Sequence, residues 1–167
     1  MDTGLYVIMG VAGSGKTTIG AQFARARDLP FVEGDDLHST ENRRRMAAGI
    51  ALTDDDRRPW LLAIAARLRE ARDAGHGLVV ACSALKRSYR DLLRTEGASE
   101  VRFVFLRGKR PILDERLAAR RGHFMPASLL DSQLATLEEP APDEAAWVYD
   151  VSRPPEAIVA DLVRRTA

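Results

Sequence analysis

One glycine-rich stretch has the residue types and spacing of a phosphate-binding loop. Residues 10–17 read G-V-A-G-S-G-K-T, which matches G-x-x-x-x-G-K-T, and they directly follow the apolar run Leu5–Met9. Glycines let the backbone N–H groups wrap a polyphosphate, and a helix starting near Lys16 adds its positive dipole end. In such loops the lysine contacts the β- and γ-phosphates and the hydroxyl, here of Thr17, is a Mg²⁺ ligand. The residues expected to contact the nucleotide are Gly10, Ala12, Gly13, Ser14, Gly15, Lys16, Thr17 and Thr18.

A pair of carboxylates follows the second apolar run. The sequence G-D-D-L-H, at 34–38, comes directly after Phe31–Glu33. Asp35 can accept a proton from a substrate hydroxyl that attacks the γ-phosphorus, or hold a water of the Mg²⁺ shell. Alternatively, Asp35 and Asp36 cap the following helix. These residues alone favour neither interpretation, and a lone histidine such as His38 is more often structural than a ligand.

Three acidic residues at 54–56 precede Arg57, Arg58 and Pro59. Clustered carboxylate oxygens suit Mg²⁺ or Ca²⁺. However, acidic residues before a helix are stabilised by its dipole, and a proline suits the first turn. We therefore favour helix capping over ligand binding for this cluster.

The third apolar run, Leu78–Cys82, is followed by Ser83 and by the cations Lys86 and Arg90. Because the run contains no acid to order a Mg²⁺ shell, Ser83 with a neighbouring carboxylate, or water, must serve. The two cations are four residues apart and share a helix face. That face either binds an anion or is solvated.

A further basic segment contains Arg116 and Arg120 on one helix face, followed by a Gly122–Pro126 break. This pattern is typical of a hinged lid whose arginines neutralise charge on a transferring phosphoryl group while the lid excludes water. The alternative is a basic, solvated helix end.

Short apolar runs alternate with amphipathic segments along the chain, which predicts an α/β fold with a parallel sheet covered by helices on both faces. The expected strands are Leu5–Met9, Phe31–Glu33, Leu78–Cys82, Arg102–Leu106 and Trp147–Val151. The expected helices are Lys16–Arg27, Thr40–Ala48, Arg57–Ala74, Lys86–Glu96, Pro111–Arg121, Ala127–Leu137 and Pro155–Arg165. Ligands bind beyond the C-terminal strand ends of such sheets, so Asp35 and Ser83 should face the ligand.

Composition narrows the function classes. The chain has 167 residues, which suits one domain, and its 25 basic and 24 acidic residues give a net charge of +1. This balance argues against nucleic-acid binding, which requires clustered excess positive charge. The single cysteine, Cys82, excludes an internal disulfide and is expected to be buried. Without a long apolar stretch or a signal-peptide pattern, the expected location is cytoplasmic, away from membranes.

Five blocks of the sequence, taken together, match one known family. They are G-D-D-L-H at 34–38, Asn42 to Trp60 with D-D-D-R-R-P-W at its end, C-S-A-L-K with Y-R-D at 82–91, R-G-H-F at 121–124, and S-Q-L with L-E and a proline at 132–140. In this order, over nearly the whole chain, they resemble the small gluconokinases of the P-loop kinase superfamily. Two positions depart from that pattern, Arg45, where the family often has lysine, and Asp36, where it is often apolar or aromatic.

This resemblance implies a single P-loop kinase domain over 1–167, with a five-stranded sheet of order 2-3-1-4-5, a substrate-binding insert at about 34–60 and a lid at about 116–130. It implies ATP- and Mg²⁺-dependent phosphorylation of D-gluconate to 6-phosphogluconate by a homodimer. Asp35 is the candidate general base or hydroxyl anchor, assisted in catalysis by Lys16 and Arg120. The residues placed at the sugar acid are Asp35, His38, Arg57, Ser83, Lys86, Arg90 and His123. The residues placed at the nucleotide beyond the loop are Arg116, Arg120 and Pro154.

Other functions remain as alternatives. A shikimate kinase also has an acid after its second strand and a lid. Two features argue against it, the residue pattern at 34–38 and 54–60 and the lack of a Gly-Gly-Gly turn after the third strand. A nucleic-acid end kinase needs a basic channel with stacking aromatics, and only ten residues are Phe, Trp or Tyr. The intact Lys16 and Thr17, the candidate base and the lid argue against a third alternative, a nucleotide-binding module without catalysis.

Overall fold

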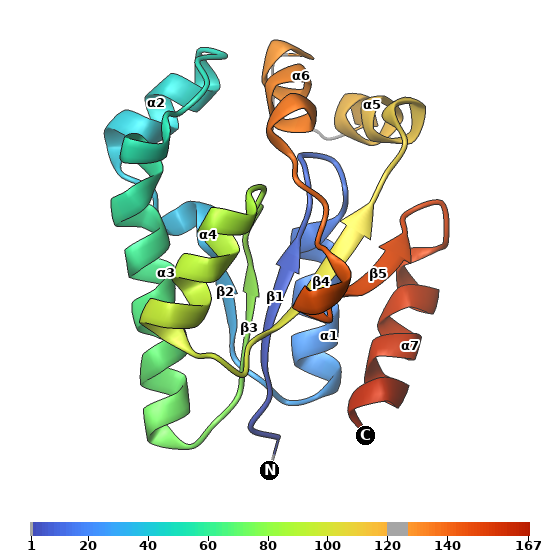
Figure 1. The fold of residues 1–167 in the computed structure, drawn as a ribbon. Helices are drawn as coiled ribbons and strands as arrows, with labels where there is room; N and C mark the ends of the chain where they lie inside the picture. The colour runs from blue at the N-terminus through green and yellow to red at the C-terminus, as the bar shows by residue number, and fades with distance from the viewer. Residues whose placement is uncertain (1, 120–126) are drawn as a thin grey trace.

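A computed structural model describes residues 2–119 and 127–167. Its centre is a five-stranded parallel sheet of order β2-β3-β1-β4-β5, which confirms the expected order (Figure 1). The strands are β1 Leu5–Met9, β2 Phe31–Glu33, β3 Leu78–Ala81, β4 Arg102–Arg107 and β5 Trp147–Asp150. The α-helices are α1 Lys16–Ala26, α2 Thr40–Ala47, α3 Asp54–Ala74, α4 Arg87–Leu92, α5 Arg110–Ala119, α6 Ala127–Thr136 and α7 Pro155–Thr166. Shorter turns of helix are η1 Gly34–Leu37, η2 Leu93–Gly97 and η3 Pro142–Glu144.

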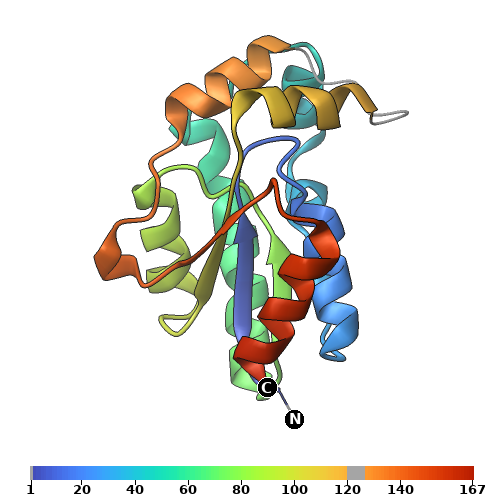
Figure 2. The same ribbon diagram turned by 90° about the vertical axis from the view of Figure 1, so that its right-hand side faces the viewer.

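Helices cover both faces of this sheet, with α3 and α4 on one side and α1 and α7 on the other (Figure 2). The central strand β1 supplies both cores because its side chains alternate between faces. Leu5, Val7 and Met9 pack with α3, whereas Tyr6 and Ile8 pack with α1 and α7. The complete burial of β1 and of β3 explains why these two strands read as continuous apolar runs. Cys82 lies buried in the first core, as expected.

Helix α3 begins three residues earlier than predicted. Thr53 caps it by accepting a hydrogen bond from the Asp56 N–H (3.1 Å), and the Asp56 carboxylate accepts from the Thr53 N–H in return (2.9 Å). This reciprocal pair fixes the helix start upstream of Arg57, so Pro59 lies inside the helix instead of in its first turn. The preference for capping is thereby confirmed for Asp56.

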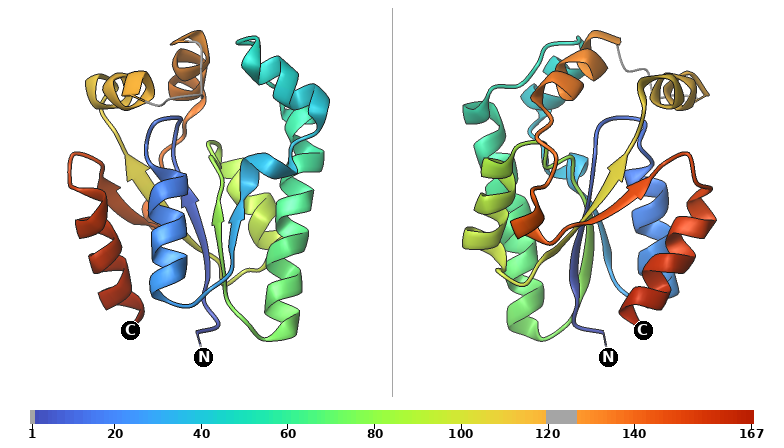
Figure 3. Two further views of the ribbon diagram at one scale, coloured as in Figure 1. Left: turned by 180° about the vertical axis from the view of Figure 1, so that it is seen from behind. Right: turned by 45° about the vertical axis from the view of Figure 1, so that its right-hand side comes forward.

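Three helices lie across the C-terminal ends of the strands. Helices α2, α5 and α6 sit at this end of the molecule, and both chain termini lie at the opposite end (Figures 1 and 3). Any ligand held beyond the strand ends is therefore surrounded by these helices. Within the described residues, no helix is both long enough and apolar enough to cross a bilayer.

Candidate active site

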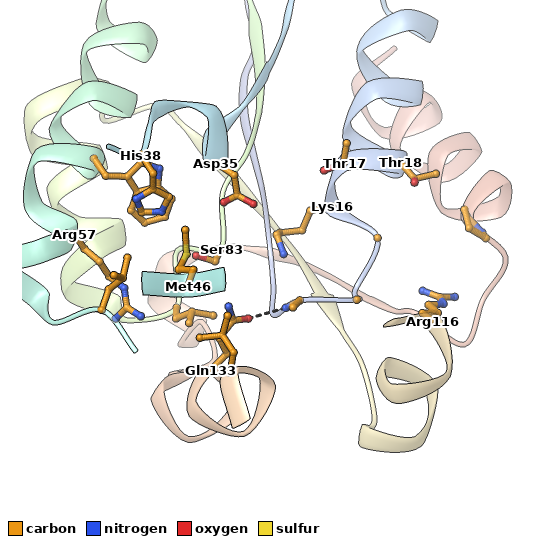
Figure 4. Close-up of a pocket in the computed structure, with 18 residues that line it drawn as sticks. Lys16, Thr17, Thr18, Asp35, His38, Met46, Arg57, Ser83, Arg116 and Gln133 are labelled. Atoms are coloured by element: carbon orange, nitrogen blue, oxygen red, sulfur yellow. Dashed lines mark hydrogen bonds between the residues drawn. The ribbon is translucent and has the colours of Figure 1, made fainter. Parts of the chain in front are cut away.

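A cavity of about 310 Å³ opens between the strand ends and the helices above them. It is lined from the phosphate loop, from η1 after β2, from the start of α3, from the loop after β3 and from α5 and α6. The residues labelled in Figure 4 that line it are Lys16, Thr17, Thr18, Asp35, His38, Met46, Arg57, Ser83, Arg116 and Gln133. The topology thus brings together most of the residues that the sequence singled out.

The phosphate loop forms a cradle of backbone at one side of this cavity. Gly13 and Gly15 have φ angles of +82° and +96°, a left-handed conformation that favours glycine. The Lys16 ammonium donates a hydrogen bond to the Val11 carbonyl (3.0 Å), within the loop. Ser14 is buried, and among the described residues its hydroxyl oxygen has no hydrogen-bond partner. Gly10 and Ser14 do not line the cavity, whereas the other expected loop residues do, namely Ala12, Gly13, Gly15, Lys16, Thr17 and Thr18.

The last residue of β2 faces the first turn of α1. The Thr17 hydroxyl donates a hydrogen bond to the carboxylate of Glu33. These two oxygen groups are of the kind that Mg²⁺ prefers. Sequence reasoning looked for a carboxylate beside Ser83 and missed Glu33. The E-x-D spacing of Glu33 and Asp35 across a strand end was the available signal.

The cavity wall opposite α1 carries the predicted carboxylate Asp35, the imidazole of His38 and the guanidinium of Arg57 (Figure 4). The His38 ring stacks on Trp60, with centroids 4.0 Å apart and planes at 16°. Burial is the main cause that lowers the pKa of His38 to about 4, against the opposing effect of Asp35, so the imidazole is neutral near pH 7. Asp35 is exposed to the cavity, and Ser39, rather than either aspartate, caps α2.

Beside Arg57 lies a set of polar side chains that we call the rim network, formed by Asp54, Arg57, Lys86 and Tyr89. The Asp54 carboxylate accepts hydrogen bonds from the Lys86 ammonium (3.0 Å) and the Tyr89 hydroxyl, which in turn accepts from Arg57 (2.7 Å). The hydrogen bonds from Tyr89 and Lys86 lower the pKa of Asp54. Lys86 therefore lies next to the cavity, bound to Asp54, and does not line it.

Arg90 does not lie in the cavity, which corrects its assignment to the substrate. Its side chain is fully buried, where Nε and Nη2 donate to the Glu144 carboxylate (2.7 and 3.1 Å) and Nη1 donates to the Ala84 carbonyl (2.8 Å). Arg94 donates to the same carboxylate (2.9 Å). Although burial opposes ionisation, these hydrogen bonds and one from the Ala141 N–H lower the pKa of Glu144 to about 2. We call Arg90, Arg94 and Glu144 the buried network; full burial keeps the donors of Arg90 away from a ligand in the cavity.

The predicted nucleotide-binding side of the cavity lies only partly within the residues that the structure describes. Arg116, on α5, lines the cavity and donates to the carbonyl of Val151, the residue that follows β5. Pro154 precedes α7, and its neighbour Pro155 lines the cavity in its place. Arg120 and His123 lie outside the described residues, as does the central part of the expected lid.

Helix α6 contributes a contact that sequence reasoning did not assign. The Gln133 side-chain oxygen accepts a hydrogen bond from the Ala12 N–H in the phosphate loop (2.7 Å), which is the dashed line in Figure 4. Gln133 also lines the cavity, below Lys16 and Asp35 in that view. The local sequence around Gln133 carries no sign of a partner 121 residues away.

Comparison with known proteins gives concordant matches. A family model described as an AAA domain matches residues 5–140. The chain is 47% identical over 158 residues to a gluconokinase of Gluconobacter oxydans, covering 95% of this chain and 88% of the relative. It is 40% identical over 163 residues to the thermoresistant gluconokinase of Escherichia coli, covering 97% and 93%.

Solved structures agree with these relatives. A gluconokinase from Sinorhizobium meliloti superposes with a TM-score of 0.87 at 49% identity, covering 98% of this chain and 94% of that one. The phosphate loop, the strand order and this sustained identity together show that the chain belongs to the gluconokinase family.

Proposed function

We propose that this protein phosphorylates D-gluconate at its 6-hydroxyl with ATP, giving 6-phosphogluconate and ADP. The observation that carries the proposal is one cavity in which the phosphate loop faces Asp35, with His38 and Arg57 beyond it (Figure 4). A nucleotide loop, a base and a set of groups for a polar acid are the parts that such a kinase requires. Family membership supports the choice of acceptor.

In the proposed reaction, Asp35 accepts the proton of the 6-hydroxyl as its oxygen bonds to the γ-phosphorus. The bond from that phosphorus to the β–γ bridging oxygen breaks, and ADP leaves with the electron pair. Lys16 offsets the charge that develops on the phosphoryl oxygens, together with Arg120 of the proposed lid at about 116–130. Catalysis is therefore mainly positioning and charge neutralisation.

Mg²⁺ fits the oxygen groups at the loop. Thr17 and Glu33, already in contact, would hold the ion or its water shell. When bound, Mg²⁺ supplies positive charge to the β- and γ-phosphates. The Thr17–Glu33 contact supports this assignment over the pairing with Ser83.

The sugar acid is assigned to the insert at 34–60 and to the loop after β3. Arg57 is the proposed carboxylate partner because its guanidinium can bind a carboxylate through two hydrogen bonds. His38, in its neutral form, and Ser83 are assigned to hydrogen bonds with hydroxyl groups of the sugar acid. Lys86 is assigned to orienting Arg57 through the rim network. His123 is assigned to closing the site. Family resemblance further suggests a cytoplasmic homodimer, which sedimentation and cell fractionation would test.

The first experiment measures ADP release with Mg²⁺ and ATP against D-gluconate, other sugar acids, shikimate and a 5′-hydroxyl oligonucleotide. We expect turnover on gluconate far above that on the other acceptors. Preference for shikimate or the oligonucleotide, or nucleotide binding with no turnover at all, would refute the proposal.

A further inference from the structure

Gln133 joins two parts of the site that are far apart in sequence. Its side-chain oxygen accepts the N–H of Ala12, a residue of the loop that would surround the phosphates of ATP. The distance of 2.7 Å is that of a strong hydrogen bond. A movement of either partner therefore strains or breaks this link.

The helix that carries Gln133 also forms part of the acceptor side of the cavity. Leu129, one turn before it on α6, lines the same cavity as Met46 and Arg57. Leu130 is fully buried in the core that α3 covers, which anchors the helix. Just after α6, the Glu138 N–H donates to the carbonyl of Leu85, another lining residue (2.8 Å). One helix thus lines the cavity through Leu129 and contacts the phosphate loop through Gln133.

We propose that Gln133 is a positioning residue that couples the two substrate sites, so that a bound sugar acid tightens ATP binding and bound ATP tightens binding of the sugar acid. A ligand against α6 restricts the helix, and the Gln133–Ala12 hydrogen bond transmits this restriction to the loop. The second ligand then binds to a loop that is already ordered, so its binding loses less conformational entropy. Reciprocity follows from thermodynamic linkage. This inference rests on the proposed function for the identity of the acceptor.

The test is a calorimetric titration of a nonhydrolysable ATP analogue with Mg²⁺, with and without saturating gluconate. We expect gluconate to tighten analogue binding about tenfold in the wild-type protein, a typical size for coupled sites. Gln133→Met has a similar length and no acceptor oxygen, and should reduce the ratio of the two Kd values to below about twofold. Gln133→Asn keeps the amide but is too short to reach Ala12, and should do the same. Ala135→Ser, an exposed change on α6 outside the proposed lid, should keep the wild-type ratio.

Two outcomes would overturn the inference, a wild-type ratio near one, or a wild-type ratio retained in both Gln133 variants. A second readout needs no ligand, because amide exchange of Ala12 reports the hydrogen bond itself. It should be faster in Gln133→Met than in the wild type, and equal rates would remove the basis of the coupling. If gluconate were not turned over at all, the proposed function would fail, while the exchange measurement would still decide whether the link exists.

Discussion

Lys86 and Arg90 are both cations and lie four residues apart, but the first side chain is partly exposed and the second is buried. Lys86 belongs to the rim network, where its side chain is 31% exposed and its partner Asp54 is 61% exposed. Arg90 belongs to the buried network, where it is 0% exposed and its partner Glu144 is 1% exposed. The partner that the tertiary structure supplies therefore decides whether a cation stays at the edge of the cavity or is buried in the fold. Changes in the cavity and rim should alter activity, and changes in the buried network should alter stability.

The largest effect is expected from the cavity carboxylate. Asp35→Asn keeps the size of the side chain and removes the base, so kcat should fall about 10³-fold, within the usual range for general-base catalysis. The free energy of unfolding should change by less than about 0.5 kcal/mol, because Asp35 is exposed. Steady-state kinetics with gluconate, alongside urea unfolding, give both values. A rise in KM at unchanged kcat would assign Asp35 to positioning instead.

The buried network should respond in the opposite way. Arg90→Met leaves the Glu144 carboxylate buried with Arg94 as its remaining charged partner, which should lower the free energy of unfolding by about 3 kcal/mol. Urea unfolding measures this loss, and KM for gluconate should stay within about twofold, since Arg90 does not line the cavity.

Arg87→Met is the matched control for that loss. This arginine is on the same helix, 43% exposed at its side chain, and paired with Asp143 on the surface. Surface pairs of this kind contribute little, so the variant should unfold within about 0.5 kcal/mol of the wild type. Equal losses for both arginines would contradict the distinction between the two regions.

The rim network should show its effect in KM. Arg57→Met removes the proposed partner of the sugar-acid carboxylate, and a charge-assisted hydrogen bond of about 2 kcal/mol corresponds to a rise in KM of about 30-fold. The KM for ATP should change far less. Arg58→Met, at the neighbouring exposed position, supplies the control. An unchanged KM for gluconate would place the carboxylate elsewhere in the cavity.

The same contrast separates what the sequence predicts from what it does not. The phosphate loop, the strands and their order follow from local patterns, because a glycine-rich turn between a buried strand and a helix has few other solutions. Capping at Thr53 and the burial of Arg90 differ in the sequence separation of the residues that cause them. The first depends on residues three apart, whereas the second depends on Glu144, which is 54 residues from Arg90. Gln133 was missed for the same reason, since only the folded chain places it against Ala12.

The smallest effect concerns the titration of His38, which lines the cavity. Its folded pKa is about 4 against an ordinary value of 6.5, so between these values the unfolded chain binds the proton and the folded protein does not. The titration of His38 therefore leaves the free energy of unfolding unchanged above pH 6.5 and lowers it as the pH falls toward 4. Allowing for partial solvation, the loss should be about 1–2 kcal/mol.

His38→Gln removes the titrating ring and retains groups that form hydrogen bonds. Subtracting its free energy of unfolding from that of the wild type, at pH 7, 6 and 5, isolates the contribution of His38 from those of the acidic residues. This difference should decrease as the pH falls. The reason is that His38 binds a proton in the unfolded wild-type chain but not in the folded protein, whereas the variant has no titrating group at this position. Parallel curves would mean that His38 has no lowered pKa. In that case the imidazole would become charged as the pH falls below about 6.5, and the wall assigned to the sugar acid would then carry two positive charges instead of one.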